Sequence, residues 1–419
     1  MHKIERLLHT LAPKGVEFRK LGEVCESTNK KTLKISEVSE VKNKGMYPVI
    51  NSGRDLYGYY HDFNNDGENI TIASRGEYAG FINYFNEKFF AGGLCYPYKV
   101  KDTNELLTKF LYFYLKTNEI QIMENLVFRG SIPALNKADI ETLTIPIPPL
   151  EIQQEIVKIL DAFTELNTEL NTELKARKKQ YEYYQNMLLD FNDINQNLKD
   201  AKMSVKTYPK RLKTLLHTLA PKGVEFKKIG ELFKRNKGIN ITAAQMKELH
   251  SEIGKVRIFA GGATKADINY KDISKKDIIN CESVIIKSRG NIGFEYYNQP
   301  FSHKNEIWSY SSKTNQMLVK FLYYYLSNNQ DYFQKLAQSS SVKLPQLSVS
   351  DTDEYEVPIP PLEIQQEIVK ILDQFSILTT DLLAGIPAEI EARKKQYEYY
   401  REKLLAFKPL TPLNSKELA

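Results

Sequence analysis

Apolar residues follow two different periods along the chain, and the change of period divides the chain into alternating segments. Across 46–100, short runs rich in Tyr, Phe, Ile and Val are broken by Gly, Asn and Asp, which predicts strands joined by turns. Residues 105–127 then carry apolar positions at helical spacing. The same order returns, with strands predicted across 255–310 and a helix over 315–337. We therefore expect an α+β domain in each half.

A much longer helical pattern opens after each PIPP tetrapeptide, at 146–149 and 358–361. A proline in or just before the first helical turn gives up only an amide that would have no partner. Apolar residues then step by threes and fours along a helix of about 40 residues, roughly 60 Å long. Such a seam needs a partner, so we predict that the two helices pair; alternatively, each lies on its own domain. The seam residues are Ile152, Ile156, Phe163, Leu166, Leu170 and Tyr181, and then Ile364, Ile368, Phe375, Leu378 and Tyr397.

The two halves are copies of each other. Residues 7–18 (LLHTLAPKGVEF) return unchanged at 215–226, and PIPPLEIQQEIVKILD at 146–161 returns at 358–373. ARKKQYEYY also occurs twice, and so do an SRG tripeptide and a PxL element. Blocks of this length do not match by chance, so the chain is a tandem duplication of one large unit.

The duplication is uneven, because 19–73 and 227–287 share little while the blocks around them are nearly identical. Two similar frameworks with two different faces suggest two related but non-identical targets. We place the boundaries at 1–149 for the first α+β domain, 150–204 for the central helix and linker, 205–361 for the second domain, and 362–419 for the last helix and tail.

The two long helices differ by four residues between constant ends. The first contains the repeat TELN-TELN-TEL at 164–174, and the second contains Gly385 and Pro387, which predict a kink or a break. Four residues are slightly more than one turn, so a whole turn can be added while the seam stays nearly in phase. A helix that tolerates such edits has the character of a spacer.

Composition narrows the class of protein. No apolar run approaches the roughly 18 residues of a membrane span, and the N-terminus is too polar for a secretory signal. The cysteines Cys25, Cys95 and Cys281 are too far apart for a disulfide framework or a cysteine-rich zinc site. We therefore expect a cytoplasmic protein with no membrane association and no metal site.

Charge is distributed unevenly. The net charge is +1 over 1–150, −3 over 151–204, +9 over 205–361 and −1 over 362–419, which together give +6. A basic domain rich in Tyr, Asn and Gly is suited to DNA phosphates and base edges, although an ordinary lysine-rich surface would look the same. The slightly acidic helices are better suited to protein partners.

Catalytic motifs are missing from the sequence. We find no GxxxxGK[ST] phosphate loop, no GxSxG, no HExxH and no NPPY-like tetrapeptide of an amino-methyltransferase. His9 and His217 belong to the constant block, where packing or capping is the simpler role. We expect a chain with no catalytic residues and no cofactor of its own.

The whole layout resembles the specificity subunit of a type I restriction–modification system. The likeness rests on the duplicated PIPPLEIQQEIVKIL block, the alternation of variable domains with constant helices, the helical tetrapeptide repeat, and the elements Pro133-Ala134-Leu135 and Pro345-Gln346-Leu347. The resemblance implies two target recognition domains, each reading one half of a split double-stranded DNA site. It also implies that the helices pack as an antiparallel coiled coil related by a pseudo-twofold repeat.

The same resemblance implies partners that do the chemistry. Two modification subunits would carry S-adenosylmethionine and methylate adenine after base flipping, and restriction/translocase subunits would use ATP and Mg²⁺. This chain would be the non-catalytic subunit that chooses the sequence. A coiled-coil scaffold that joins two binding domains without touching DNA remains an alternative, as does a stand-alone nuclease or methyltransferase.

Candidate DNA-contacting residues lie on turns and polar loops. Arg75 and Arg289, in the two SRG turns, come first because arginine can fork onto guanine or clamp a phosphate, although each could be a turn arginine in a surface ion pair. The aromatic helix faces at 110–115 and 321–326 are better explained as core than as base-stacking platforms. The remaining candidates are Asn51, Arg54, Tyr57, Arg129, Ser131, Lys265, Asn269, Lys287, Asn291, Lys304, Ser341 and Lys343.

Overall fold

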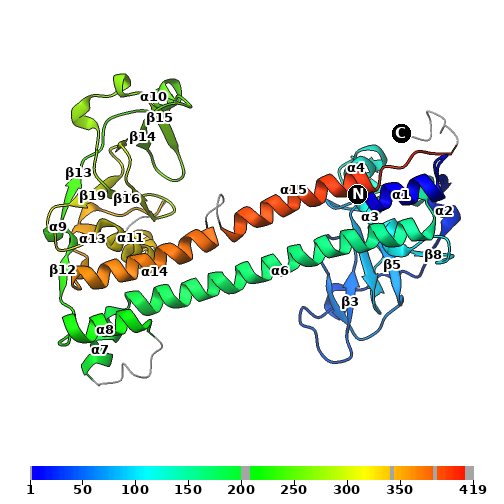
Figure 1. Cartoon of the computed structure of the whole chain (residues 1–419), viewed down its shortest axis with the longest axis horizontal. Coiled ribbons are helices and arrows are strands. Elements are labelled where there is room, and N and C mark those ends of the chain that lie inside the picture. Colours follow the sequence, from blue (N-terminus) through cyan, green and yellow to red (C-terminus); the bar gives the residue numbers. More distant parts are fainter. Residues whose placement is uncertain (1, 200–207, 340–343, 381–384, 411–419) are drawn as a thin grey trace. The chain divides into compact units, whose positions relative to one another are not determined.

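The chain folds into two compact units, each with its own core (Figure 1). The first unit contains the residues up to Asn171 and those from Glu389 onward, and the second contains Thr172–Ala388. Each unit therefore combines one α+β domain with parts of both long helices. The computed structural model describes residues 2–199, 208–339, 344–380 and 385–410.

The first domain is built on two sheets. A four-stranded antiparallel sheet has the order β2-β8-β5-β6, and a three-stranded sheet has the order β4-β3-β7 with β3 and β7 parallel. Two further strand pairs are β1-β11 and β9-β10. The strands are β1 (Glu17–Lys20), β2 (Cys25–Ser27), β3 (Tyr47–Ile50), β4 (Gly58–Tyr60), β5 (Glu68–Ala73), β6 (Ile82–Asn86), β7 (Phe90–Ala91), β8 (Cys95–Val100), β9 (Val127–Phe128), β10 (Ala134–Leu135) and β11 (Thr144–Ile147).

The second domain repeats the two sheets and the β1-β11 pair of the first domain. Its sheets have the orders β13-β19-β16-β17 and β15-β14-β18, and β12 pairs with β20. The strands are β12 (Phe226–Lys228), β13 (Phe233–Asn236), β14 (Val256–Phe259), β15 (Lys265–Ile268), β16 (Ser283–Lys287), β17 (Gly293–Tyr297), β18 (Phe301–His303), β19 (Trp308–Ser312) and β20 (Glu356–Pro358). The duplication read from identical blocks thus extends to the parts whose sequences differ.

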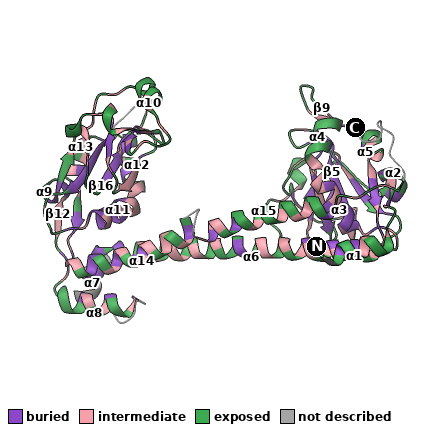
Figure 2. Ribbon diagram, turned by 45° about the horizontal axis from the view of Figure 1, so that its top comes forward, coloured by how far each residue is buried: buried purple, intermediate pink, exposed green. Residues whose placement is uncertain are grey.

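Helices pack against one face of each large sheet. Figure 2 shows β5 with α3, and β16 with α11, as buried elements of the two domains. In the first unit the helices are α1 (His2–Leu11), α2 (Leu21–Val24), a 3-10 turn at Ile35–Glu37, α3 (Thr108–Thr117), α4 (Glu119–Leu126) and α5 (Lys137–Glu141). In the second they are α7 (Phe191–Lys199), α8 (Lys210–Leu219), α9 (Ile229–Leu232), α10 (Ala243–Leu249), 3-10 turns at Tyr270–Asp272 and Lys275–Asp277, α11 (Val319–Asn328), α12 (Gln330–Ser339) and α13 (Val349–Asp353).

Each helix predicted to follow the strands is in fact two helices. Asn118 ends α3, its side-chain amide donates to the carbonyl of Tyr114 at 2.8 Å, and α4 starts at the next residue. Asn329 does the same between α11 and α12 through Tyr325. The aromatic faces of α3 and α11 are core, as expected, because Phe110 and Phe321 are fully buried.

A buried glutamine fastens each long helix to its own domain. Gln153 is fully buried; its side-chain oxygen accepts from the amide of Leu107, and its nitrogen donates to the carbonyls of Glu105 and Pro148 at 2.8 and 2.7 Å. Gln365 repeats the arrangement with Leu318 and with the carbonyls of two further residues. Buried polar groups are stable only when hydrogen-bonded, and here every bond of the side chain also fixes the helix start.

The long helices pair in each unit through the same contact. Helix α6 (Leu150–Leu189) is unbroken over 40 residues. In the first unit the ring of Phe163 lies 5.7 Å from that of Tyr400, which belongs to α15 (Ile386–Leu404). In the second unit the ring of Phe375, in α14 (Leu362–Thr380), lies 5.1 Å from that of Tyr184 near the end of α6. The start of each helix meets the end of the other, which confirms the antiparallel pair.

The seam residues serve two purposes. Ile152, Ile156, Ile364 and Ile368 are fully buried and belong to the domain cores. The later positions are buried or half-buried: Phe163, Leu166, Leu170, Tyr181, Phe375, Leu378 and Tyr397. Across the helix pair, the ring of Phe163 contacts that of Tyr397, and the ring of Tyr181 contacts that of Phe375. At the predicted break, Gly385 forms a bend and α15 begins at Ile386, while residues 381–384 lie outside the described residues.

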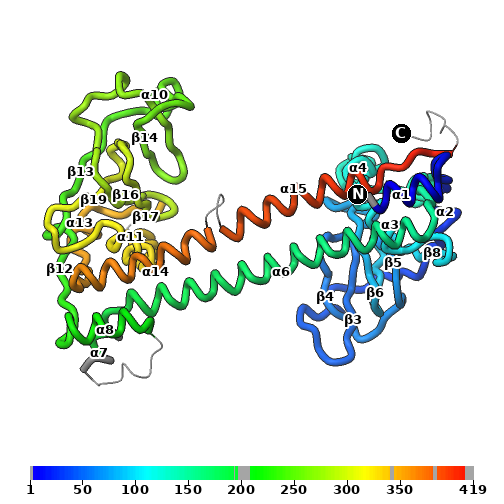
Figure 3. Tube along the Cα trace, in the orientation of Figure 1, coloured from blue at the N-terminus to red at the C-terminus, as the bar shows by residue number. Residues whose placement is uncertain are grey.

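Both ends of the described chain lie together in the first unit (Figure 3). The amide of Val16 donates to the carbonyl of Lys408, and the amide of Leu410 donates to the carbonyl of Val16. Leu404, in the last turn of α15, is only 3% exposed and joins the core that contains Ile4 and Leu160. The first domain is therefore completed by residues from the far end of the chain.

Candidate nucleic-acid interface

The SRG turn and the PxL element form one hydrogen-bonded frame. In the first domain, the amide of Gly76 donates to the carbonyl of Pro133, and the amide of Leu135 donates to the carbonyl of Ser74, both at 2.9 Å. These bonds flank an antiparallel pairing of Arg75 with Ala134. Two motifs nearly 60 residues apart in sequence therefore meet in space.

The second domain contains the same frame. The amide of Gly290 donates to the carbonyl of Pro345, the amide of Leu347 donates to the carbonyl of Ser288, and both distances are again 2.9 Å. Arg289 pairs with Gln346, as Arg75 pairs with Ala134. The frame is constant between the copies, whereas the side chain opposite the arginine is not.

Glycine makes the SRG turn possible. Gly76 and Gly290 have φ values of +96° and +75°, in the left-handed region that other residues rarely adopt. Ser74 and Ser288, on the other side of each arginine, are buried. With one neighbour buried and the other turning the chain, the arginine between them remains at the surface.

Five predicted contact residues at or next to the two frames are exposed. Among the described residues, Arg75, Arg129 and Ser131 have no side-chain hydrogen bond or ion pair, and Asn291 follows the second turn at the surface. Arg289 is exposed too and lies near the Glu306 carboxylate. Unpaired guanidinium groups are available to a phosphate or to a guanine edge without first breaking an internal bond.

Other predicted cations already have an acidic neighbour. The ammonium of Lys287 lies 2.7 Å from a carboxylate oxygen of Glu295, and that of Lys304 lies 2.9 Å from Glu306. The guanidinium of Arg54 is 3.7 Å from Asp55 and largely exposed. A phosphate would have to compete for the two lysines, so they are weaker candidates than the SRG arginines.

Asn51 has a structural role in the described fold. Its side-chain oxygen accepts from the amide of Leu94 at 3.0 Å, and a side chain at Gly92 would collide with it. Tyr57, in the loop before β4, is 41% exposed, and its role stays a prediction.

In the second domain, Lys265 opens β15 at the surface and Asn269 follows the same strand half-buried. Ser341 and Lys343 lie outside the described residues. Neither Lys265 nor Asn269 is joined to the SRG frame by a backbone pairing, so the four residues stay predictions.

The histidine next to Lys304 is inside the domain. His303 is fully buried, with its ring nitrogens near the carbonyl of Lys304 and the hydroxyl of Ser309. Burial lowers the pKa of His303 from its ordinary value of 6.5, because the charged ring would be poorly solvated there. A neutral histidine with both nitrogens engaged holds the strand end and offers no charge to DNA.

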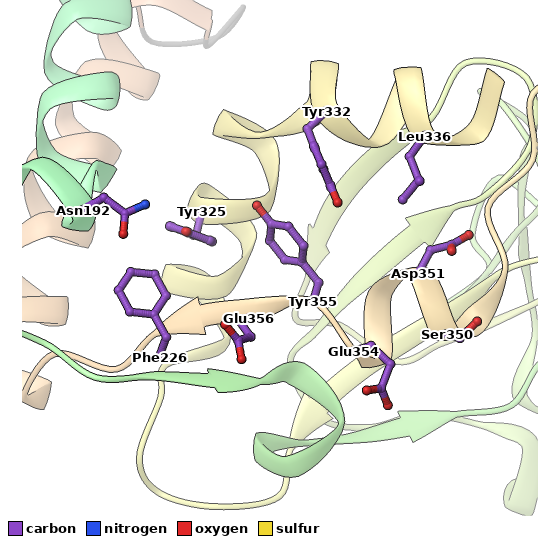
Figure 4. A pocket seen from close by; sticks show the side chains of 10 residues that line it. All are labelled: Asn192, Phe226, Tyr325, Tyr332, Leu336, Ser350, Asp351, Glu354, Tyr355 and Glu356. Atoms are coloured by element: carbon purple, nitrogen blue, oxygen red, sulfur yellow. The ribbon is translucent and has the colours of Figure 1, made fainter. Parts of the chain in front are cut away.

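A hollow of about 820 Å³ lies at the base of the second domain (Figure 4). Figure 4 shows Tyr325, Tyr332 and Tyr355 gathered on one side of it. Asp351, Glu354 and Glu356 also line the hollow. Carboxylates repel phosphate, so we exclude this hollow from the nucleic-acid interface.

The sequence contains both elements of the frame but does not show that they pair. Both SRG and PxL occur twice, which was the available signal that they belong together. Phe128 is not among the predicted contact residues, and the place of Gln346 opposite Arg289 was not predicted, because neither residue is repeated in the other copy. Their importance comes from strand register, which composition does not reveal.

Two further observations concern metal binding and membrane-spanning helices. Over the described ranges, no group of three or more His, Cys, Asp and Glu side chains could hold a metal ion. In the same part of the chain, no helix has the length and apolarity to span a membrane.

The duplicated frame, the repeated topology and the antiparallel helices can be compared with known proteins. A profile of the type I restriction modification DNA specificity domain matches residues 13–179 and again residues 221–392. The chain belongs to this family. It is a specificity subunit, the non-catalytic component of a restriction–modification system, with no catalytic cofactor of its own.

Relatives match over nearly the whole length. A Haemophilus influenzae protein named as a type I restriction enzyme specificity subunit is 32% identical over 413 residues, covering 94% of this chain and 96% of that protein. An Escherichia coli type I restriction enzyme specificity subunit is 27% identical over 446 residues, covering 99% of both chains.

A solved structure supports the fold. The crystal structure of a type I restriction–modification S subunit from M. genitalium matches with a TM-score of 0.62 at 21% sequence identity. The match covers 96% of this chain and 97% of that one.

Proposed function

We propose that each α+β domain reads one half of an asymmetric, two-part DNA site. The observation that carries this proposal is the duplicated SRG–PxL frame, which holds an exposed arginine in the same place in both domains. The residues around the two arginines differ, with Ala134 in one frame and Gln346 in the other. Equal frames with unequal side chains suit two half-sites of different sequence.

In this proposal the long helices are the spacer between the two domains that read the half-sites. Helix α6 contains 40 residues, which corresponds to roughly 60 Å at 1.5 Å per residue. Its tetrapeptide repeat lies where the first unit ends, at Asn171, and the second begins. The gap between half-sites would then follow the number of helical turns.

The outward faces of the helices would dock two modification subunits. The seam residues are covered by the chain itself, so a partner would meet the polar side of α6, α14 and α15. S-adenosylmethionine would be bound by the modification subunits, and ATP and Mg²⁺ by restriction/translocase subunits.

We keep the proposed domain boundaries after residues 149, 204 and 361.

DNA binding by the assembled methyltransferase tests the proposal. Its site is first defined by mapping methylated adenines in the host genome. We expect Arg75→Ala and Arg289→Ala to relax one half-site each and to leave the other unchanged, with about 10- to 100-fold weaker binding of the cognate duplex. Affinity of the wild-type complex should also fall steeply with salt. If the complex shows no preference for its site and neither substitution changes binding, the chain would instead be a scaffold that does not itself touch DNA.

A further inference from the structure

A short hairpin projects from the frame of the first domain. Strands β9 and β10 pair Val127 with Leu135 and Phe128 with Ala134, and residues 129–133 form the turn between them. The turn is exposed, as Figure 2 shows beyond β9. Its sequence, RGSIP, adds a cation and a glycine to a tip that protrudes from the domain.

Strand register places an arginine and an aromatic ring on one face of this hairpin. Arg75 is paired with Ala134, and Ala134 is paired with Phe128. Directly opposed residues of antiparallel strands point to the same face, and each step is about 4.5–5.5 Å between Cα atoms. Arg75 and Phe128 therefore flank the small side chain of Ala134 at a separation of about 10 Å.

The ring of Phe128 is unusually exposed for a phenylalanine. It is 75% exposed, and Ile132 on the same turn is 53% exposed. A Cβ atom at Gly130 would lie only 2.9 Å from the ring, so the glycine leaves room for the ring beside the turn. A large apolar side chain that stays exposed on a protruding hairpin indicates a site where another molecule binds.

The charges nearby favour DNA as that occupant. The guanidinium groups of Arg75 and Arg129 are exposed and unpaired among the described residues, and Glu77 is the acidic residue closest in sequence to the turn arginine. Two cations beside an aromatic ring match a phosphate backbone beside a stack of bases. An apolar protein surface would not need the arginines.

We infer that Phe128 is a wedge that stacks against an opened base step in the half-site read by the first domain, while Arg75 holds the adjacent phosphate or guanine edge. The inference rests on the proposed DNA-reading function. Apolar side chains placed between base pairs unstack and kink the duplex, at a cost that depends on the step, so Phe128 adds sequence selectivity without a hydrogen bond to a base.

The second domain lacks this wedge by sequence. Phe128 is five residues before Pro133, and the residue five before Pro345 is Ser340, which lies outside the described residues. Distortion by an aromatic side chain is thus assigned to one half-site only.

The experiment uses the full chain assembled with its modification subunits and a duplex that carries the methylation-defined site. We expect Phe128→Ala to weaken cognate binding about 10- to 100-fold, as loss of one stacking contact does, and to change binding of unrelated duplex by less than about twofold. Phe128→Trp should restore most of the affinity. With 2-aminopurine at successive positions, fluorescence should rise at one step of the first half-site in the wild type and not in Phe128→Ala.

Ile120→Ala is the matched control, because Ile120 is 70% exposed on α4 of the same domain but off the hairpin. Wild-type affinity and fluorescence in Phe128→Ala would overturn the wedge. Loss of complex assembly in Phe128→Ala would show that the ring docks a protein partner and would equally overturn it. Failure of the wild-type complex to prefer its site would refute the proposed function, a result distinct from both.

Discussion

At the scale of single residues, the buried glutamines show how a surface-type side chain becomes structural. Gln153 and Gln154 are neighbours in PIPPLEIQQEIV, yet one is fully buried and the other is exposed. The difference follows from helical geometry, because a step of one residue rotates the side chain by about 100°. Only Gln153 faces the start of α3.

We predict that Gln153→Ala lowers the free energy of unfolding of the first unit by about 2–4 kcal/mol, because it leaves the Leu107 amide and two carbonyls without their partner. Gln154→Ala should change it by less than about 0.5 kcal/mol. Hydrogen exchange of α3 amides across a urea series measures both. Equal effects of the two substitutions would show that the hydrogen bonds to Gln153 contribute little.

At the scale of elements, α6 contains the tetrapeptide repeat by which the two long helices differ in sequence. Its repeat lies in an unbroken helix, whereas in the other helix Gly385 forms a bend just before α15 begins at Ile386. Four added residues lengthen a helix by about 6 Å and rotate its end by about 40° beyond a full turn.

We predict that inserting or deleting one TELN unit in 164–174 shifts the gap between half-sites by one or two base pairs, since a base pair advances about 3.4 Å. Mapping methylated adenines in cells that carry each variant measures the gap. A single alanine inserted at the same place is the control, because a rotation of about 100° displaces the seam and should abolish modification. Unchanged spacing in the TELN variants would reject the spacer role.

Much of the fold could be predicted at this scale because its signals are local. The strands of 46–100, the start of α6 after Pro149 and the break near Pro387 all follow from neighbouring residues. The division of each domain helix at Asn118 or Asn329 was missed, because apolar spacing continues through the asparagine. The contact of Ser74 and Gly76 with Pro133 and Leu135 was missed because it joins distant segments.

At the scale of the whole molecule, the first unit depends on residues from both ends of the chain. Leu404 lies in the core of that unit, and the backbone near Pro409 pairs with Val16. A substitution near the end of α15 should therefore lower the stability of the first domain, although that domain begins hundreds of residues earlier in the sequence.

We predict that Leu404→Ala destabilises the first unit by about 2–5 kcal/mol, as expected for a leucine that is 3% exposed. The same substitution at Leu410, which is 52% exposed, should be nearly neutral. Limited proteolysis with identification of the cut sites would show which unit has become less stable. Cuts in the second unit, with the first intact, would contradict the expected assignment of Leu404.

The SRG–PxL frame has a consequence for how such a protein can change its target. All of its hydrogen bonds join main-chain atoms of Ser74, Gly76, Pro133 and Leu135, and the second copy uses the equivalent atoms. Mutation at 128 or 134 therefore leaves these bonds in place and alters only what the surface presents. Substitutions at this edge can therefore change the DNA specificity of the domain with little loss of its stability.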